Sequence, residues 1–277
     1  MEINPVNTPF NYTGNKFNLL PQLLPHFDYT SKIFIDVFAG GGSVYTNVID
    51  KYEKIIVNDI IKDLVECHKL LIEIWGFKDL VKSYCPAYDN QTAYLQLREW
   101  YNNNPSPEKL FALMLSCTNN MLRFNKQFKF NQTFGKRTYN SHTEEKIEKF
   151  IEHITPYKNK IEYKSVEFNL VCDDIEKIQQ SMFYFDPPYY GTSAGYNNYW
   201  SKKHEEELFN YIRFIDKHRG SFVLSGIKGE HKNKPQSTII TRLIELGYNV
   251  IELDYKYQKV SRNKTSQLGT EIIIKNY

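Results

Sequence analysis

One stretch of the sequence ends an apolar run abruptly: Phe183-Tyr184-Phe185-Asp186-Pro187-Pro188-Tyr189-Tyr190. The residues from Ser181 to Phe185 are aromatic-rich and bounded by turn residues, which predicts a short buried strand. Pro187 and Pro188 offer no backbone N–H to a sheet, so the strand ends at Asp186 and a rigid turn follows. Asp186 is therefore expected at the carboxyl end of a strand, where open α/β sheets bind their ligands.

The chemistry of this turn admits two interpretations. A carboxylate, a carbonyl without a local donor and a stacking tyrosine ring together suit the exocyclic amino group of a flat base. A buried strand capped by a proline turn with surface tyrosines would carry the same residues. The rest of the chain has to decide between them.

Composition sets broad bounds. The chain has 277 residues and a formal net charge of +3, which permits nucleic acid as a partner without arguing for it. Its four cysteines are scattered, with no C-x-x-C pair and no histidine at metal spacing, so we expect reduced, buried thiols and no metal site. The sequence has no signal-like start and no apolar run of about 18 residues, which predicts a cytoplasmic protein without membrane association.

A glycine-rich turn lies early in the chain. The residues from Ile33 to Phe38 predict a buried strand, and Ala39-Gly40-Gly41-Gly42-Ser43 follows at once, before a helical segment. Strand, glycine turn and helix in this order are typical of a nucleotide-cofactor half-site, because glycines let backbone approach a ligand. Neither G-x-G-x-x-G nor a P-loop is present, so no pyrophosphate cradle is implied. A tight strand-to-helix turn without a ligand is the plainer alternative.

Two charged residues flank this turn in the sequence. Asp59 ends the next predicted strand, about twenty residues after the glycines, where an acid commonly accepts hydrogen bonds from ribose hydroxyls. Asn58 or Asp59 could also cap the helix that follows, and both roles can hold at once. Lys16 follows the polar turn that begins at Asn11; judged alone, its side chain is expected to be solvated rather than bound to an anion.

The alternation of strands and helices lapses between about residues 62 and 154. Apolar residues at helical spacing predict several helices there, the last of them from Leu110 to Met121. A basic, aromatic stretch from Asn119 to Asn131 follows, and Phe134-Gly135-Lys136-Arg137 closes it. Arginine, lysine and amide side chains interleaved with phenylalanine favour contacts to base edges and phosphates, although the phenylalanines could also be core residues.

After Pro156 the alternation resumes, which favours an α/β fold. Strands and helices are predicted in turn at 161–163 (strand), 173–179 (helix), 181–185 (strand), 205–217 (helix), 221–225 (strand), 237–246 (helix), 249–253 (strand) and 271–275 (strand).

Taken in this order, the motifs resemble those of Dam-type (alpha-group) DNA adenine-N6 methyltransferases. The resemblance covers nearly the whole chain and is carried by Tyr12-Thr13-Gly14-Asn15-Lys16, Phe38-Ala39-Gly40-Gly41-Gly42-Ser43, Asn58-Asp59, the stretch from Asn120 to Asn125 with Phe130-Asn131, and Asp186-Pro187-Pro188-Tyr189. Asp36-Val37-Phe38 departs from the commoner Glu-Pro-Phe but keeps the acid. Tyr12 stands where a tryptophan is frequent, and Asn15 where a glycine is frequent.

The resemblance implies a Rossmann-like class I methyltransferase sheet, mixed with one antiparallel strand. It also implies two parts: a catalytic domain formed by residues 1–62 and 155–277, and an inserted, mostly helical target-recognition domain at 63–154. The implied cofactor is S-adenosyl-L-methionine, which agrees with a glycine turn that lacks a phosphate signature. The implied substrate is double-stranded DNA, with a separately acting restriction endonuclease as an expected partner and a monomer or weak dimer as the expected state.

The same resemblance assigns roles to individual residues. Asp186 and the Pro187 carbonyl would accept hydrogen bonds from adenine N6, and Tyr189, after Pro188, would stack on the flipped base. The cofactor residues would be Tyr12, Lys16, Asp36, Phe38, Ala39, Gly40, Gly42, Asp59, Phe168 and Asp186. The expected groove contacts are Asn120, Arg123 and Asn125, and the expected phosphate contacts are Lys126, Lys129, Lys136 and Arg137.

Other functions share the Asp-Pro-Pro-Tyr chemistry. An RNA methyltransferase or a cytosine-N4 methyltransferase would use the same amine contacts. A DNA-binding relative without activity is the alternative from a different class, and the intact glycine turn, Asp59 and Asp186 speak against it.

Overall fold

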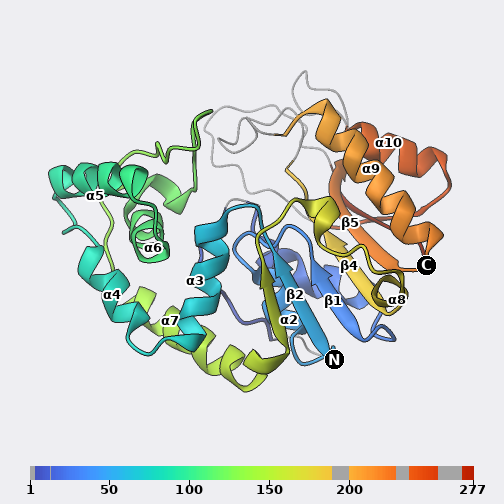
Figure 1. The fold of residues 1–277 in the computed structure, drawn as a ribbon, viewed down its shortest axis with the longest axis horizontal. Coiled ribbons are helices and arrows are strands. Elements are labelled where there is room, and N and C mark those ends of the chain that lie inside the picture. Colours follow the sequence, from blue (N-terminus) through green and yellow to red (C-terminus); the bar gives the residue numbers. More distant parts are fainter. Residues whose placement is uncertain (1–3, 13, 189–199, 229–236, 255–269) are drawn as a thin grey trace.

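A seven-stranded sheet forms the centre of the fold (Figure 1). The computed structural model describes residues 4–12, 14–188, 200–228, 237–254 and 270–277. The strand order is β3-β2-β1-β4-β5-β7-β6. The strands are β1 Ile33–Asp36, β2 Lys54–Asn58, β3 Ile161–Lys164, β4 Ser181–Phe185, β5 Ser221–Lys228, β6 Asn249–Glu252 and β7 Thr270–Lys275.

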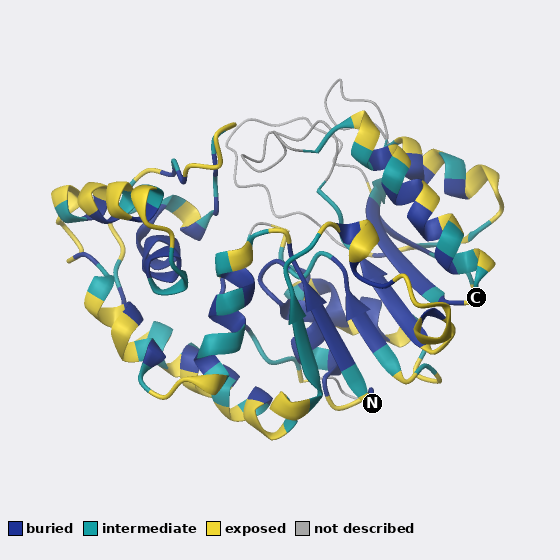
Figure 2. Cartoon of the chain, in the orientation of Figure 1, coloured by how far each residue is buried: buried dark blue, intermediate teal, exposed yellow. Residues whose placement is uncertain are grey.

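The expected mixed sheet with one antiparallel strand is confirmed. The pairs β3–β2, β2–β1, β1–β4 and β4–β5 are parallel, whereas β7 runs antiparallel to both β5 and β6. Every residue of β4 is buried, because helices cover both faces of the parallel part (Figure 2). This explains why β4 is a continuous apolar run rather than an alternating one.

Alternate residues of β4 enter two separate cores, as the two-residue repeat of a strand requires. Phe183 and Phe185 pack on one face with Leu208 and Ile212 of α9 (Lys202–Lys217). Tyr184 faces the other core. The first face is covered by α8 (Ile175–Gln179), α9 and α10 (Thr238–Glu245). On the second face, α1 (Leu20–Leu23) and α2 (Ser43–Val48) contribute buried residues to the core.

Five helices lie between β2 and β3 in the chain and beside the sheet in space (Figure 1). They are α3 Lys62–Glu73, α4 Phe77–Tyr84, α5 Gln91–Asn103, α6 Pro107–Ser116 and α7 Ser141–Ile154. The second core is continuous from the sheet into these helices, and α6 lies inside it with most of its residues buried. The division into a catalytic domain and an insertion at residues 63–154 stays a prediction.

The helix expected from Leu110 to Met121 is shorter than predicted. It ends at Ser116, and a 3-10 turn follows at Thr118–Asn120. Asn119 and Asn120 adopt left-handed backbone, with φ of 58° and 55°, which asparagine tolerates better than most residues. The chain leaves the helix here and enters the basic, aromatic stretch.

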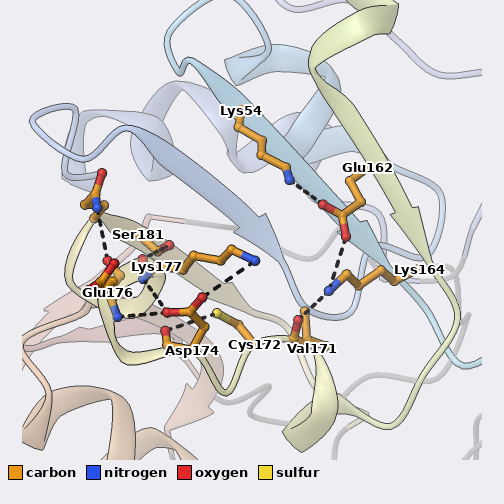
Figure 3. A network of polar contacts seen from close by, with 10 residues as sticks. Lys54, Glu162, Lys164, Val171, Cys172, Asp174, Glu176, Lys177 and Ser181 are labelled. Carbon is orange, nitrogen blue, oxygen red and sulfur yellow. Dashed lines mark hydrogen bonds and ion pairs between the residues drawn. The ribbon is translucent and has the colours of Figure 1, made fainter.

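The β3 edge of the sheet carries charged side chains (Figure 3). Lys54 of β2 pairs with Glu162 of β3, which also lies 3.3 Å from Lys164. Lys164 donates to the Val171 carbonyl at 2.9 Å, so the edge strand is tied to the chain beyond it. Charges at an edge strand discourage pairing with another sheet.

The strand order reverses between β1 and β4. Asp36 ends β1 and Asp186 directly follows β4, so the two acids lie at the carboxyl ends of adjacent parallel strands. This reversal is where open α/β sheets form their ligand crevice. Among the described residues, none of the helices has the length and apolar character needed to cross a bilayer.

Candidate active site

Asp186 forms an ion pair with a lysine from the start of the chain. Lys16 Nζ lies 2.8 Å from Asp186 Oδ2 and 3.3 Å from the Gly14 carbonyl oxygen, and the lysine is only 5% exposed. Burial alone would lower the pKa of Lys16, but the Asp186 charge and hydrogen bond outweigh it and raise that pKa above its ordinary value. The expectation that Lys16, judged alone, is solvated is therefore wrong. Its turn delivers a fixed cation to the end of β4.

Asp36 lies beside this pair and is 1% exposed. Its Oδ2 accepts a hydrogen bond from Tyr45 N at 3.2 Å, whereas its Oδ1 has no hydrogen-bond partner among the described residues. Burial raises the pKa of Asp36 well above its ordinary value, and the charges of Asp186 and Asp59 add to that effect. A buried carboxylate oxygen without a donor is a place where a ligand cation or N–H group would bind favourably.

The glycines of the turn after β1 make room for the protein's own side chains. A Cβ on Gly40 would lie 2.9 Å from the ring of Tyr12, and one on Gly42 would lie 2.5 Å from Tyr45 and 2.6 Å from His68. Both glycines have positive φ, 48° and 75°, which any other residue would adopt with strain. The turn is therefore packed closely on both sides.

Asp59 binds the same turn through its carboxylate. Oδ2 accepts from Gly40 N at 2.9 Å, and Oδ1 accepts from Ile61 N at 2.9 Å at the entry to α3. Burial raises the pKa of Asp59, and these two backbone donors oppose that shift. Asp59 thus binds the N-cap residue Ile61 rather than capping α3 itself, so the predicted capping role is wrong. Each of its oxygens keeps a second lone pair for a ligand hydroxyl.

Asn58 connects three segments of the site, a role that the sequence analysis did not assign. Its Nδ2 donates to Val37 O at 3.0 Å and to Val166 O at 3.1 Å, while its Oδ1 accepts from Val166 N at 3.1 Å. The segment after β3 is thereby fixed against the ends of β1 and β2. A buried asparagine at a strand end was the available signal, but helix capping explained it equally well.

Three aromatic rings gather beside the turn. Phe38, Phe168 and Trp200 have ring centroids 5.7 Å apart in every pair. Phe168 begins a 3-10 turn, Phe168–Leu170, and is buried. Aromatic faces of this kind suit a flat heterocycle. The structure therefore brings predicted residues Phe38 and Phe168 together and adds Trp200 to them.

The basic, aromatic stretch after α6 forms an irregular hairpin, residues 121–134, with an antiparallel bridge between Phe124 and Phe130. Arg123 Nε donates to Asn131 Oδ1 at 2.9 Å, and Arg123 NH2 donates to Asn131 O at 2.7 Å. Asn125 Oδ1 accepts from Lys129 N at 3.0 Å. Two of the polar residues expected to contact DNA thus also stabilise the hairpin itself.

The phenylalanines of the hairpin divide into two kinds. Phe124 and Phe130 are buried core residues, while Phe128 is 62% exposed at the tip, with a left-handed φ of 56°. Next to it, Lys126 and Lys129 are exposed. The tip therefore presents cations and one aromatic ring to the outside.

The remaining predicted DNA contacts lie on either side of the hairpin. Lys136 and Arg137 are exposed, and Arg137 NH1 donates to Asn120 Oδ1. Asn120 itself is 6% exposed, so it is held inside the fold. The assignments to DNA stay predictions for all of these residues.

The remaining predicted catalytic residues, Pro187, Pro188 and Tyr189, follow Asp186 in the chain. Tyr189 lies outside the described residues, and Pro187 and Pro188 line a small cavity with Trp200 and Ser225. Within the described ranges no three His, Cys, Asp or Glu residues group in a way that could hold a metal ion.

A model of the D12 class N6 adenine-specific DNA methyltransferases matches residues 12–258. The chain belongs to this family. The resemblance seen in the motifs is thereby confirmed, and the mixed sheet with its strand reversal agrees with it.

Individual relatives match different shares of the chain. Modification methylase StsI of Streptococcus sanguinis is 29% identical over 285 residues, which cover 98% of this chain and 43% of the relative. Type II methyltransferase M.FokI of Planomicrobium okeanokoites is 28% identical, again covering 98% of this chain and 43% of the relative. DNA adenine methylase of Vibrio cholerae is 25% identical over 203 residues, 68% of each chain. The chain thus spans less than half the length of the first two relatives.

Proposed function

We propose that this chain transfers a methyl group from S-adenosyl-L-methionine to N6 of an adenine in double-stranded DNA. The observation that carries the proposal is the Lys16–Asp186 pair at the end of β4, 2.8 Å apart, directly before two prolines and beside the strand reversal. Membership of the D12 family supports both the amine chemistry and the DNA substrate.

The residues around the glycine turn fit the proposed cofactor. The Asp36 oxygen without a partner among the described residues suits an ammonium, which would offset the burial that raises the pKa of that carboxyl. Asp59 would accept ribose hydroxyls with its second lone pairs, and Phe168 would lie against the adenine ring. When bound, this cofactor supplies an electrophilic methyl group on a sulfonium.

Asp186 and the Pro187 carbonyl would position the target amine. An aromatic amine is a poor nucleophile because its lone pair is delocalised into the ring. Two acceptors, one for each N6–H, would pin the nitrogen and favour a pyramidal geometry with its lone pair directed at the methyl group. Lys16 holds the carboxylate in place, so positioning and electrostatics would contribute most of the rate.

A stacked adenine cannot reach an acid at the end of a buried strand, so the base would have to leave the duplex. The exposed cations Lys126, Lys129, Lys136 and Arg137 would bind the phosphate backbone around it. Arg123 and Asn125 would order the hairpin that enters the groove. Asn120 would fix the two ends of this hairpin through its hydrogen bond with Arg137.

The biological setting we propose follows from the printed names of the relatives. Two of them are called modification methylase and type II methyltransferase, so a restriction endonuclease that acts separately on the same site would be the partner. Protection of methylated DNA from cleavage in an extract of the source cells would test this partner directly.

The function itself is tested by incubating unmethylated plasmid and, in a parallel reaction, RNA with the protein and labelled S-adenosyl-L-methionine, then identifying the labelled nucleoside by mass spectrometry. We expect labelled N6-methyl-2′-deoxyadenosine and no labelled cytosine. Label in N4-methylcytosine, or in RNA but not DNA, would replace the proposal with one of its alternatives.

A further inference from the structure

His68 lies directly behind the glycine turn and is used by none of the steps above. It belongs to α3 and is 1% exposed. Its Nε2 lies 3.0 Å from the Gly40 carbonyl oxygen, and its Nδ1 lies 3.0 Å from the Tyr45 hydroxyl oxygen. The imidazole packs on Phe10, with ring centroids 4.0 Å apart. Both ring nitrogens therefore have a defined partner in a closed environment.

These contacts define the tautomer. A carbonyl oxygen can only accept, so His68 Nε2 must carry the hydrogen, and Nδ1 then accepts from the Tyr45 hydroxyl. Burial lowers the pKa of His68 to about 4, so the ring is neutral at physiological pH. A single orientation of the ring satisfies both bonds.

Gly40 is held at both of its backbone groups. Its N–H donates to Asp59 Oδ2 at 2.9 Å, and its carbonyl accepts from His68 Nε2 at 3.0 Å. Because the carbonyl and the following N–H of a trans peptide point in opposite directions, His68 also directs the Gly41 N–H away from α3. The imidazole thus sets the plane of the peptide between Gly40 and Gly41. Without this hydrogen bond, the permissive backbone of glycine would let that plane vary.

The helix that carries His68 is tied to the other helices between β2 and β3. Tyr101 OH of α5 donates to Asp63 Oδ2 at 3.0 Å, and Cys67 Sγ lies 3.1 Å from the Pro107 carbonyl oxygen of α6. Asp63 and Cys67 are on α3, as is His68. The position of the imidazole therefore depends on the neighbouring helices as well as on the sheet, to which Asp59 ties the start of α3.

We propose that His68 is a positioning residue for cofactor binding: its Nε2–H holds the Gly40 carbonyl so that the glycine turn is preformed for the methyl donor. The inference rests on the proposed function, because it takes S-adenosyl-L-methionine as the ligand of the turn. It adds that a helix outside the sheet, α3, supplies one of the two side chains that hold Gly40.

A matched pair of substitutions tests the Nε2–H donor. His68→Gln keeps an amide N–H at a similar reach, whereas His68→Met has a side chain of similar length and no donor. We expect the dissociation constant for S-adenosyl-L-methionine, measured by calorimetry, to rise about tenfold in His68→Met and to stay within about threefold of wild type in His68→Gln. The Michaelis constant for the cofactor should follow, with kcat at saturating cofactor and the Michaelis constant for DNA nearly unchanged.

Two results would overturn the inference: equal weakening in both variants, which marks a packing role, or wild-type affinity in His68→Met. Absence of cofactor binding by the wild-type protein would instead contradict the proposed function. Should a variant fail to fold, nitrogen NMR of the wild-type imidazole gives the answer without substitution. It should show the Nε2–H tautomer with a resonance that moves on adding the cofactor, and the Nδ1–H tautomer would refute the proposal.

Discussion

The glycine turn after β1 and the hairpin after α6 are both shaped by side chains that bind backbone, but those side chains come from different distances along the chain. Gly40 is held by Asp59 and His68, which lie 19 and 28 residues away on other elements. The tip of the hairpin, residues 123–131, is held from within by Arg123 on Asn131 and Asn125 on Lys129, 8 and 4 residues away. Its returning segment is also bound from α5, by Asn102 on Phe130 and by Tyr94 and Arg98 on Gln132.

The difference teaches which part of the molecule can change without the rest. A turn fixed by distant elements depends on the packing of the whole core. A substitution in such a turn therefore also affects the elements that hold it. A hairpin tip fixed by local hydrogen bonds can exchange its exposed residues while the fold stays intact. We therefore expect the cofactor site and the hairpin predicted to contact DNA to respond separately to substitution, and the following predictions test that separation.

The largest effect is expected from Asp186→Ala. Removing the carboxylate removes one of the two amine acceptors, so kcat should fall about 10³-fold. Cofactor affinity should change by less than about tenfold, because Asp36, Asp59 and the glycine turn remain. Single-turnover methylation and calorimetry check the two values, and turnover close to wild type would remove Asp186 from the mechanism.

Lys16→Met should have the next largest effect. The methionine keeps the buried stem but leaves Asp186 without its cation, so kcat should fall about 10- to 100-fold. A kcat close to wild type would show that the pair serves folding alone; the melting temperature is the control.

Arg123→Met tests the hairpin. Two guanidinium bonds to Asn131 are lost, so the hairpin should become less ordered and kcat/KM for DNA should fall about tenfold. The cofactor dissociation constant should not change, since the hydrogen bonds of Arg123 stay within the hairpin. A matching loss of cofactor affinity would break the separation between the two regions.

Lys129→Met tests the exposed tip and should have a smaller effect. Its cation is expected to meet phosphate, so DNA affinity should fall about threefold on every sequence, and the slope of log affinity against log salt should decrease by about one. Binding titrations at several salt concentrations measure this. A change confined to one DNA sequence would assign Lys129 to base contact instead.

A pH dependence of the unfolding free energy is also expected, on stability rather than on activity or binding. The pKa of His68 in the folded protein, about 4, lies below the ordinary 6.5. The contribution of the neutral ring to the unfolding free energy is therefore fully present above pH 6.5 and is lost as the pH falls toward 4. Between pH 7 and pH 4.5, wild type should lose up to ~2 kcal/mol more unfolding free energy than His68→Gln. Denaturant titrations of both proteins at the two pH values test the difference.

The sequence predicted the site best where chemistry coincides with a strand end. Asp59 and Asp186 were placed correctly at the ends of β2 and β4, because an apolar run followed by an acid and a turn is typical of the carboxyl end of a buried strand. The strand predicted from Ile33 to Phe38 instead ends two residues earlier, at Asp36. Lys16 was misjudged from its own turn, since its partner Asp186 is 170 residues away. Local pattern carries no information about such a pair.

The residues that the sequence analysis missed look like ordinary core residues. His68 falls at helical spacing among Leu64, Val65 and Leu71, so nothing separates it from them until the fold brings Gly40 beside it. The end of α6 was missed for a related reason: the helical pattern continues to Met121, whereas Asn119 and Asn120 turn the chain away. Both features depend on tertiary contacts or on backbone conformation rather than on periodicity.

The most direct test of the proposed methyl transfer is a map of modified bases in a plasmid treated with wild-type protein and, in parallel, with Asp186→Ala. Single-molecule sequencing reports every modified adenine and cytosine. We predict N6-methyladenine at one short recurring sequence in the wild-type sample and none in the variant when both reactions are stopped early, since the kcat of the variant should be about 10³-fold lower. N4-methylcytosine, or modified adenines that persist in Asp186→Ala, would contradict the proposed mechanism.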